Sequence, residues 1–279
     1  MGSTLGGRRR KLGGWRKLAN AQWGPPNDPQ IYGDIDVDAT ALLEFRDRLR
    51  EQTGAPVTVT HLVGKAIAHA MASSRDLNVR LFAGNVVQRD TIDVFFIVSA
   101  EQGSELSGVK VERADEKGVA DIAAELASRA GRIRTGTDEE FGKTKSMLGR
   151  TPHWALRYAM RLSAWLTADL DLDLKRFGLP RQAFGSAMVT SVGMFGIQHA
   201  YAPLARTYRV PLLVLVGEIT PKPVVVDGDI VARPILTLSV TLDHRYLDGF
   251  HAARLARATR EYCEDPAKFE PDGDVYVST

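Results

Sequence analysis

Apolar and polar residues alternate along the first half of the chain with two different periods. A period of two residues is typical of strands with one buried face, and a period of about 3.6 is typical of amphipathic helices. The short period predicts strands at residues 30–38, 79–82, 85–88 and 92–100. The long period predicts helices at residues 39–52, 58–74 and 118–134. The helix at 58–74 is rich in alanine and glycine, so we expect it to pack closely on a sheet.

The second half of the chain is rich in strand-forming residues and ends in a helical pattern. Strands are predicted at residues 187–191, 212–218, 223–226, 230–233 and 235–242. A final helix is predicted over residues 249–264, just before Pro266. Between residues 137 and 182 the pattern changes, and a helix from Trp154 to Ala168 stands apart from the other elements.

Together these elements predict a single α/β domain over residues 1–279, a two-layer sandwich of a mixed sheet and flanking helices. Residues 1–29 are expected to form an N-terminal arm and residues 137–182 a helical insertion. The helix of the insertion mixes tryptophans, arginines and apolar residues. It is expected to pack on the core or at a subunit interface, and the alternative is a lid or a lipid-facing surface.

Composition and charge narrow the functional classes. The 36 basic and 34 acidic residues leave a formal net charge of +2, which favours neither nucleic acid nor an anionic membrane as a partner. Cys263 is the single cysteine, so an internal disulfide or a cysteine-rich metal site is excluded, and a reducing, cytoplasmic location is expected. The sequence has no HExxH pair, no nucleotide-binding glycine motif and no apolar stretch of membrane-spanning length, so we expect no metal, nucleotide-hydride or transmembrane function.

The segment Asp243-His244-Arg245-Tyr246-Leu247-Asp248-Gly249 is the strongest candidate for chemistry. His244 follows a strand and precedes a helix, a junction that leaves side chains at an edge or cleft. A histidine can take a proton from a thiol or hydroxyl near neutral pH if its neighbours fix its position. Asp248 is expected to cap the last helix by accepting a backbone N–H. The other five histidines are expected to be structural or exposed.

Several motifs around His244 resemble one known family. The runs are Pro221-Lys222-Pro223 to Asp227-Gly228, then Arg233-Pro234, Leu238-Ser239, Asp243-His244-Arg245 with Asp248-Gly249, and, upstream, Thr190-Ser191-Val192-Gly193. In this order they resemble the acyltransferase core of 2-oxoacid dehydrogenase complexes, which belongs to the chloramphenicol acetyltransferase-like superfamily. The resemblance covers most of the chain except the insertion. It implies a chloramphenicol acetyltransferase-like fold and acyl transfer through coenzyme A.

The resemblance also implies roles for particular residues. His244 matches the general base, and Thr190 matches the hydroxyl that stabilises the oxyanion of the tetrahedral intermediate. Asp248 matches an aspartate that pairs with an N-terminal arginine, for which Arg16 is the candidate; the alternative for Arg16 is a solvated residue of a basic tail. Ser191 stands where most relatives carry asparagine. Asp243, Arg245 and Gly249 are expected to support the loop.

The family further implies a homotrimer whose active site lies between subunits, either alone or within a larger cage. The expected reaction moves an acyl group between coenzyme A and a dihydrolipoamide-like thiol. The chain shows no lipoyl domain and no peripheral subunit-binding domain, so a lipoyl group is expected only on another protein, such as a dehydrogenase complex subunit.

Two other functions stay open at this point. The first is a freestanding acyltransferase that acts on a small-molecule or lipid hydroxyl or thiol. The second is a catalytically inactive assembly core or regulator of a 2-oxoacid dehydrogenase-type complex. The presence of His244, Asp248 and Thr190 together favours an active enzyme over a scaffold.

Overall fold

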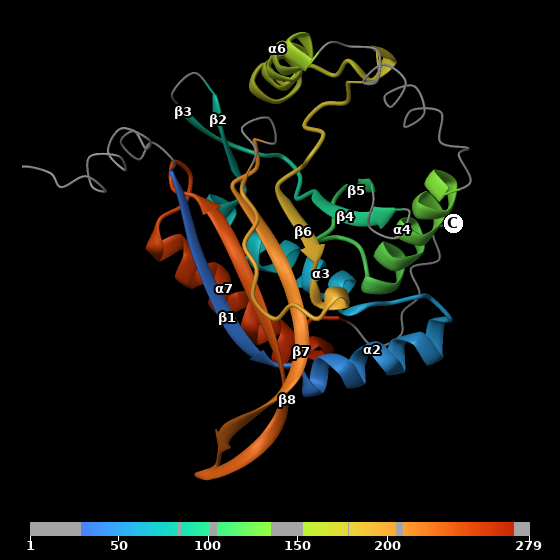
Figure 1. The fold of residues 1–279 in the computed structure, drawn as a ribbon, viewed down its shortest axis with the longest axis vertical. Coiled ribbons are helices and arrows are strands. Elements are labelled where there is room, and N and C mark those ends of the chain that lie inside the picture. The colour runs from blue at the N-terminus through green and yellow to red at the C-terminus, as the bar shows by residue number, and fades with distance from the viewer. Residues whose placement is uncertain are drawn as a thin grey trace, which may run out of the picture.

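A six-stranded mixed sheet forms the centre of the computed structural model, which describes residues 29–82, 85–100, 105–134, 153–177, 179–204 and 209–270. The strands in spatial order are β1 (Gln30–Asp38), β8 (Asp229–Asp243), β7 (Leu212–Val226), β6 (Ala187–Ser191), β4 (Val94–Ala100) and β5 (Glu105–Val111). β6 runs parallel to β4 and β7, and the other neighbouring pairs are antiparallel. The predicted two-layer α/β fold with a mixed sheet is confirmed (Figure 1).

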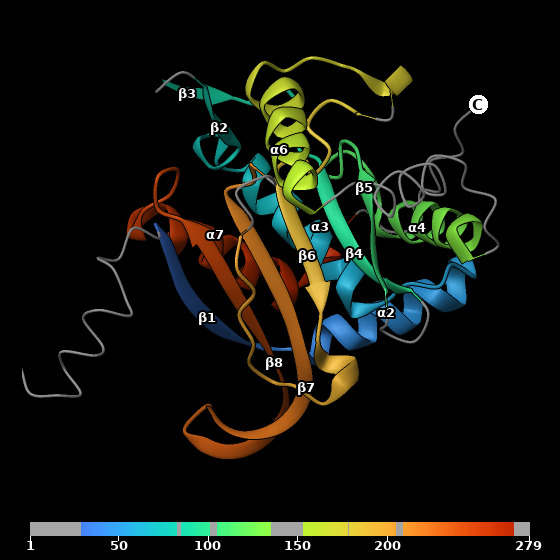
Figure 2. The ribbon, with the colours of Figure 1, turned by 45° about the horizontal axis from the view of Figure 1, so that its top comes forward.

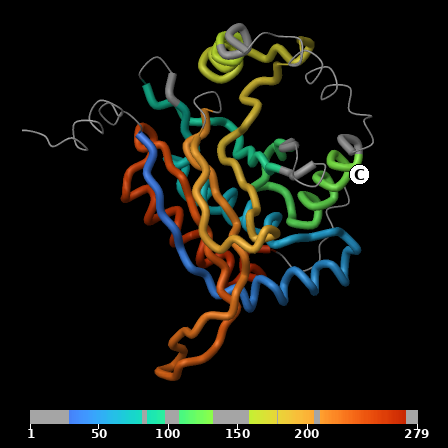
Figure 3. The backbone as a smooth tube through the Cα atoms, in the orientation of Figure 1, coloured from blue at the N-terminus to red at the C-terminus, as the bar shows by residue number. Residues whose placement is uncertain are grey.

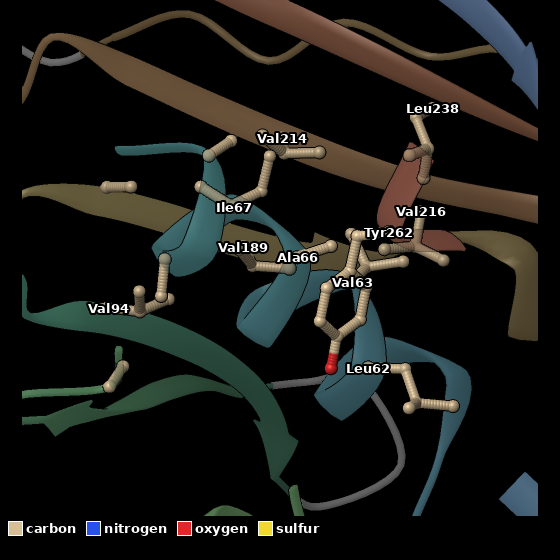
Figure 4. Packing of buried hydrophobic residues seen from close by; sticks show 14 of the residues in the cluster. Leu62, Val63, Ala66, Ile67, Val94, Val189, Val214, Val216, Leu238 and Tyr262 are labelled. Atoms are coloured by element: carbon tan, nitrogen blue, oxygen red, sulfur yellow. The ribbon is translucent and has the colours of Figure 1, made fainter. Parts of the chain in front are cut away.

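Four helices pack on one face of this sheet and enclose the main core. They are α2 (Thr40–Thr53), α3 (Val59–Ala72), α4 (Val119–Arg134) and α7 (Gly249–Glu264). Figure 4 shows α3 lying directly against the strands, with Ala66 and Ile67 facing Val189 and Val214. A Cβ at Gly64 would lie 2.2 Å from the Phe96 ring, so the helix approaches β4 this closely only with glycine there. The expected close packing of the small-residue helix is confirmed.

The opposite face of the sheet carries a smaller apolar cluster. Met188, Val210, Leu213 and Leu215 form its buried part, and the segment of residues 196–204 crosses over it. Side chains of the sheet hold this segment in place: the Thr241 hydroxyl donates to the carbonyl of Ala202 at 2.8 Å. Within the part of the chain that the structure describes, extended chain therefore covers this cluster.

β7 and β8 continue well past the sheet as a two-stranded arm (Figures 1 and 3). The sequence predicted four short strands here, and that prediction is wrong, because each pair forms one continuous strand of fifteen residues. Pro221 and Pro234 lie opposite one another in the arm. Prolines fit a two-stranded ribbon because each strand has a free edge that needs no donor. The turn at Asp227-Gly228 is confirmed.

Two further departures concern the middle of the chain. β5 was not predicted, since glycine and serine interrupt its apolar pattern, although it pairs with β4 along seven residues. The predicted strand at 92–100 begins at Val94, and the predicted helix 154–168 is α6 (His153–Ala164), which continues as a π-helical turn, Trp165–Asp169. A separate hairpin joins β2 (Val79–Phe82) to β3 (Asn85–Gln88) as predicted. Short 3-10 turns lie at Arg75–Leu77, Lys175–Phe177, Gly193–Phe195 and Pro266–Lys268.

We call residues 153–182 the α6 segment; residues 137–152 of the predicted insertion lie outside the described residues. Figure 2 shows α6 beside the β2–β3 hairpin, at the end of the sheet opposite the arm. Ion pairs fasten the segment there. The Arg209 guanidinium binds both oxygens of Asp169 at 2.9 and 2.8 Å. Asp171 is paired with Arg80 at 3.3 Å and, within the segment itself, with Arg181 at 2.5 Å.

Candidate active site

His244 lies in the turn that joins β8 to α7, with its side chain exposed. Its backbone N–H donates to the carbonyl of Pro29 at 2.7 Å, which ties the turn to the start of β1. Three residues later, Leu247 is fully buried in the core, and its N–H donates to Asp243 at 3.1 Å. The backbone of the turn is therefore fixed on both sides of a solvent-accessible imidazole, as a general base requires.

Asp243 and Arg245 form an ion pair within the same turn. The buried Asp243 carboxylate accepts from the Arg245 backbone N–H at 3.0 Å, and the guanidinium contacts both carboxylate oxygens, the shortest contact being 2.5 Å. These hydrogen bonds raise the pKa of Arg245. Asp243 is thus directed at Arg245 and stabilises the shape of the turn.

Asp248 is the N-cap of α7, as predicted. Its Oδ1 atom accepts from the backbone N–H groups of Phe250 and His251 at 3.0 and 3.1 Å. The backbone and side-chain hydrogen bonds from His251 lower the pKa of this carboxyl group. Arg16, the expected partner of Asp248, lies outside the described residues. At Gly249, a Cβ would meet nothing within 4 Å, so no close contact demands glycine there.

Thr190 and Ser191 end strand β6 on the other side of β7. Thr190 is partly buried and lies in register with Leu215, and the Ser191 hydroxyl contacts the carbonyl of Val216 at 3.5 Å. The chain then turns through Gly193, where a Cβ would lie 2.5 Å from the carbonyl oxygen of Gly217. This contact makes glycine necessary at the turn that follows Thr190.

The strand register separates Thr190 from His244 within one chain. Thr190 pairs with Leu215, which pairs with Ser239, four residues before the end of β8 at Asp243. With about 3.3 Å per residue along a strand and about 4.8 Å between strands, the Cα atoms of Thr190 and Asp243 are about 16 Å apart. That distance exceeds the combined reach of the two side chains. A single chain therefore does not bring the histidine and the hydroxyl together.

Other groups with reactive potential are structural in the described residues. Burial raises the pKa of the Cys263 thiol to about 12, so it stays protonated and unreactive near neutral pH. Burial, with a smaller effect from Arg50, lowers the pKa of His61 to about 4. Within the described ranges, no cluster of three or more metal-binding side chains is found. Nor does any helix in this part of the chain have the length and apolarity to cross a membrane.

A further residue of the candidate site, His251, had not been predicted from the sequence. His251 contacts the Asp248 carboxylate through Nδ1 at 2.7 Å and lies near Asp76 on its other side. Its position three residues after a predicted N-cap was the available signal, because the third residue of a helix often bonds back to the cap. The typical residue there is glutamate or glutamine, so the histidine was not recognised.

The α/β fold and the histidine between β8 and α7 fit the acyltransferase family that the sequence motifs resemble. The family model described as 2-oxoacid dehydrogenases acyltransferase (catalytic domain) matches residues 20–142 and 181–270. The chain belongs to this family. The unmatched residues 143–180 fall within the predicted insertion 137–182.

Curated relatives are acyltransferase components of larger complexes. The chain is 25% identical over 237 residues to the succinyltransferase component of the 2-oxoglutarate dehydrogenase complex of Saccharomyces cerevisiae, covering 84% of this chain and 42% of that protein. It is 24% identical over 261 residues to the acetyltransferase component of the acetoin cleaving system of Bacillus subtilis, covering 91% of this chain and 54% of that protein. The chain thus spans about half the length of the curated relatives it matches.

Solved structures share the fold. A probable dihydrolipoamide acetyltransferase from Listeria monocytogenes superposes with a TM-score of 0.64 at 21% identity, over 97% of this chain and 98% of that chain. The dihydrolipoamide acetyltransferase of Azotobacter vinelandii, studied for the roles of a serine, a histidine and an asparagine in its catalytic mechanism, gives 0.63 at 22% identity, over 87% and 84%. The expected resemblance to dihydrolipoamide acyltransferase cores is confirmed.

Proposed function

We propose that this protein is a coenzyme A-dependent acyltransferase in which His244 is the general base. The observation that carries the proposal is the exposed His244 imidazole on a turn fixed by Pro29, Asp243 and Leu247, in a chain of the acyltransferase family. The acceptor that the relatives' names favour is the thiol of a dihydrolipoyl group, carried by another protein or by another part of a longer chain.

The reaction needs one base and one hydroxyl. His244 takes the proton of the acceptor thiol, and the sulfur attacks the thioester carbonyl of acyl-coenzyme A. The Thr190 hydroxyl stabilises the resulting oxyanion by donating a hydrogen bond. The bond from carbon to the sulfur of coenzyme A then breaks, and the proton held by His244 passes to the departing thiolate. A thioester is already electrophilic, so positioning and proton transfer suffice without an acyl-enzyme.

The distance between Thr190 and His244 supports a site made by two chains. In a homotrimer, a histidine from one subunit can face the Thr190 of its neighbour, which one chain alone cannot arrange. One structural neighbour forms the cubic core of a pyruvate dehydrogenase complex, so a larger cage is a natural extension of the proposal. Other complex subunits would then be partners, and we place the protein in the cytoplasm.

The Azotobacter enzyme gives a further comparison. Its named histidine and asparagine are four positions apart, the same spacing as His244 and Asp248 here. Asp248 therefore replaces an amide by a carboxylate at this position. We propose that Asp248 holds the turn through the α7 cap, and that the Arg16 guanidinium binds its remaining oxygen.

A small-molecule or lipid acceptor is the second candidate. The α6 segment favours it, because Tyr158, Leu162 and Trp165 are exposed at a spacing that places them on one side of the helix. An apolar surface at this end of the sheet suits a bulky acyl chain or acceptor better than a short acetyl group.

The test is release of free coenzyme A thiol from short and long acyl-coenzyme A donors, with dihydrolipoamide or small alcohols as acceptors. Since general-base help contributes about 10²–10⁴-fold, His244→Ala should lower kcat by that factor while the protein stays folded. Thr190→Val should lower kcat by about 10²-fold. His199→Ala, an exposed histidine remote from the turn, is the matched control. A folded wild-type protein without turnover for any pair would favour the assembly-core alternative.

A further inference from the structure

Two helices of this protein begin with the same unusual arrangement, a histidine at the third helical position that bonds back to the N-cap. In α3 the pair is Thr58 and His61, and in α7 it is Asp248 and His251. The two sites share the capping motif but differ in their surroundings. A comparison of the two histidines therefore shows which contacts belong to the cap and which are found only at α7.

In α3 the histidine serves the cap alone. The Thr58 backbone N–H donates to Nδ1 of His61 at 3.2 Å, so this nitrogen is an acceptor and the ring is neutral. The low pKa of about 4 that burial gives His61 agrees with this state. The ring packs edge-on against Phe96, and no carboxylate contacts it within the described residues.

In α7 the same ring nitrogen faces a carboxylate. Nδ1 of His251 lies 2.7 Å from Asp248 Oδ1, but 3.4 Å from the Asp248 backbone nitrogen. Asp248 is ionised near neutral pH because its pKa is lowered, so its oxygen can only accept. Two lone pairs at this distance would repel, so Nδ1 carries a hydrogen and donates it to Asp248. The backbone N–H of Asp248 then cannot donate to the same nitrogen.

The other nitrogen of His251 faces a second carboxylate, on a different element. Nε2 is 3.7 Å from Oδ2 of Asp76, in the turn that follows α3. Asp76 also accepts from Arg254 of α7 at 2.6 Å, and Arg254 in turn contacts the Ser74 hydroxyl at 2.6 Å. The charged groups facing His251 are therefore Asp248, Asp76 and Arg254. A chain of contacts connects the cap of α7 to the end of α3.

We propose that His251 is a positioning residue that bridges the carboxylates of Asp248 and Asp76 and thereby fixes the turn that carries His244. Asp248 ends that turn, so a force that holds its carboxylate also limits the motion of the preceding four residues. The inference rests on the proposed function, since it assigns His251 to the placement of the base. His251 touches no reacting atom.

Substitution of His251 by glutamate or glutamine separates bridging from capping. Glutamate is a preferred capping-box residue, and it accepts from the Asp248 N–H as a cap requires. It cannot donate, and it puts a third negative charge between Asp248 and Asp76. Glutamine also fits the cap and can donate its amide hydrogen to Asp248. If His251 only caps the helix, the two variants should have equal kcat. If His251 bridges the two carboxylates, only His251→Gln should keep kcat near the wild-type value.

The first readout is steady-state kinetics well below the melting temperature of each variant. His251→Glu should lower kcat by about tenfold with KM for acyl-coenzyme A within about twofold, because a misplaced base slows the chemical step. His251→Gln should stay within about threefold of the wild type. The matched control is His61→Gln, which alters the equivalent cap of α3 and should leave kcat unchanged.

The second readout is hydrogen exchange of the amides from His244 to Phe250, which needs no turnover. His251→Glu should speed exchange of these amides, notably those of His244 and Leu247, which donate to Pro29 and Asp243. Asp76→Asn, which removes the charge at the far end without touching the cap, should act in the same direction. If His251→Glu shows wild-type exchange and kcat equal to that of His251→Gln, the bridge does not exist. Hydrogen exchange is measured without substrate. If the wild type has no acyltransferase activity, the proposed function fails, but the exchange rates still decide whether the bridge exists.

Discussion

At the scale of single residues, the surroundings of a histidine determine its charge and its use. His61 is partly buried beside Phe96, and this burial, with a smaller effect from the charge of Arg50, favours its neutral form in the folded state. His244 is exposed on a fixed turn, where the proposed mechanism needs it to take a proton from the acceptor. His251 is hydrogen-bonded to Asp248 through Nδ1 and lies 3.7 Å from Asp76 on its other side. One residue type thus supplies a cap at His61 and, in our proposals, a base at His244 and a bridge at His251.

The partly buried His61 makes the free energy of unfolding depend on pH. Its folded-state pKa of about 4 is below the unfolded value of about 6.5, so the folded protein binds fewer protons between these values. The stability that results is complete above about pH 6.5 and is lost as pH falls toward 4, by about 2–3 kcal/mol. Urea unfolding at pH 7 and pH 4.5 should show this difference, and His61→Gln should remove it.

The exposed His199 provides the control for that experiment. His199→Gln should leave the loss of stability between the two pH values as it is in the wild type, since His199 is about half exposed beside Asp34. An unchanged pH dependence in His61→Gln would mean that another group, not His61, causes the acid sensitivity.

The sequence could predict the turn that carries His244 and the Asp248 cap because both depend on local order: a β-branched strand, a turn and an amphipathic helix. It could not predict the role of His251, because Asp76 is distant in sequence and approaches only when α3 and α7 pack together. The ion pairs of the α6 segment escaped for the same reason, since Arg80 and Arg209 come from separate elements.

At the scale of elements, long-range pairing decides what local pattern leaves open. β5 is an edge strand interrupted by glycine and serine, and its pairing with β4 holds it in the sheet. The register of β7 and β8 continues through the two prolines of the arm. Each strand of the arm is paired on one side only, so its other edge needs no backbone donor. Local sequence propensity was enough to predict the centres of most strands and helices. Where these strands end depends on their pairing with other strands.

The α6 segment is held at the histidine end of the sheet by its ion pairs. Arg209 lies just before Pro211, whose carbonyl accepts from the Asp243 N–H at 2.9 Å. Asp169→Asn weakens a two-bond ion pair that is partly shielded from water, which should cost about 1–2 kcal/mol. Since this cost falls on the attachment of the segment, limited proteolysis should cut within residues 153–182 faster than in the wild type, with little change in the melting temperature of the core.

Asp229→Asn is the matched control, because Asp229 is an exposed residue at the start of β8 in the distant arm. It should leave the cleavage rate of the α6 segment unchanged. Equal cleavage of wild type and Asp169→Asn would show that the Arg209 pair does not hold the segment.

At the scale of the whole molecule, the sheet register argues for a site shared between subunits. β6 and β8 are separated by β7, and Thr190 and His244 lie at different heights on the sheet. The sequence could indicate a shared site only through its family resemblance. No local sequence pattern gives the distance between residues on two strands that are not neighbours. The described register supplies an independent physical reason for the same expectation.

A mixing experiment tests the shared site directly. His244→Ala and Thr190→Val should each keep no more than about 1% of the wild-type kcat alone. In the proposed homotrimer, a mixed assembly places an intact histidine beside an intact threonine at one of its three interfaces. Random assembly of equal amounts makes about three quarters of the trimers mixed, so about one quarter of the wild-type activity should return on co-expression. A site contained within one chain would regain nothing, whatever the ratio of the variants. The recovered fraction therefore distinguishes the two arrangements without a structure of the assembly, and light scattering of the same samples reports the size of the oligomer in which they formed.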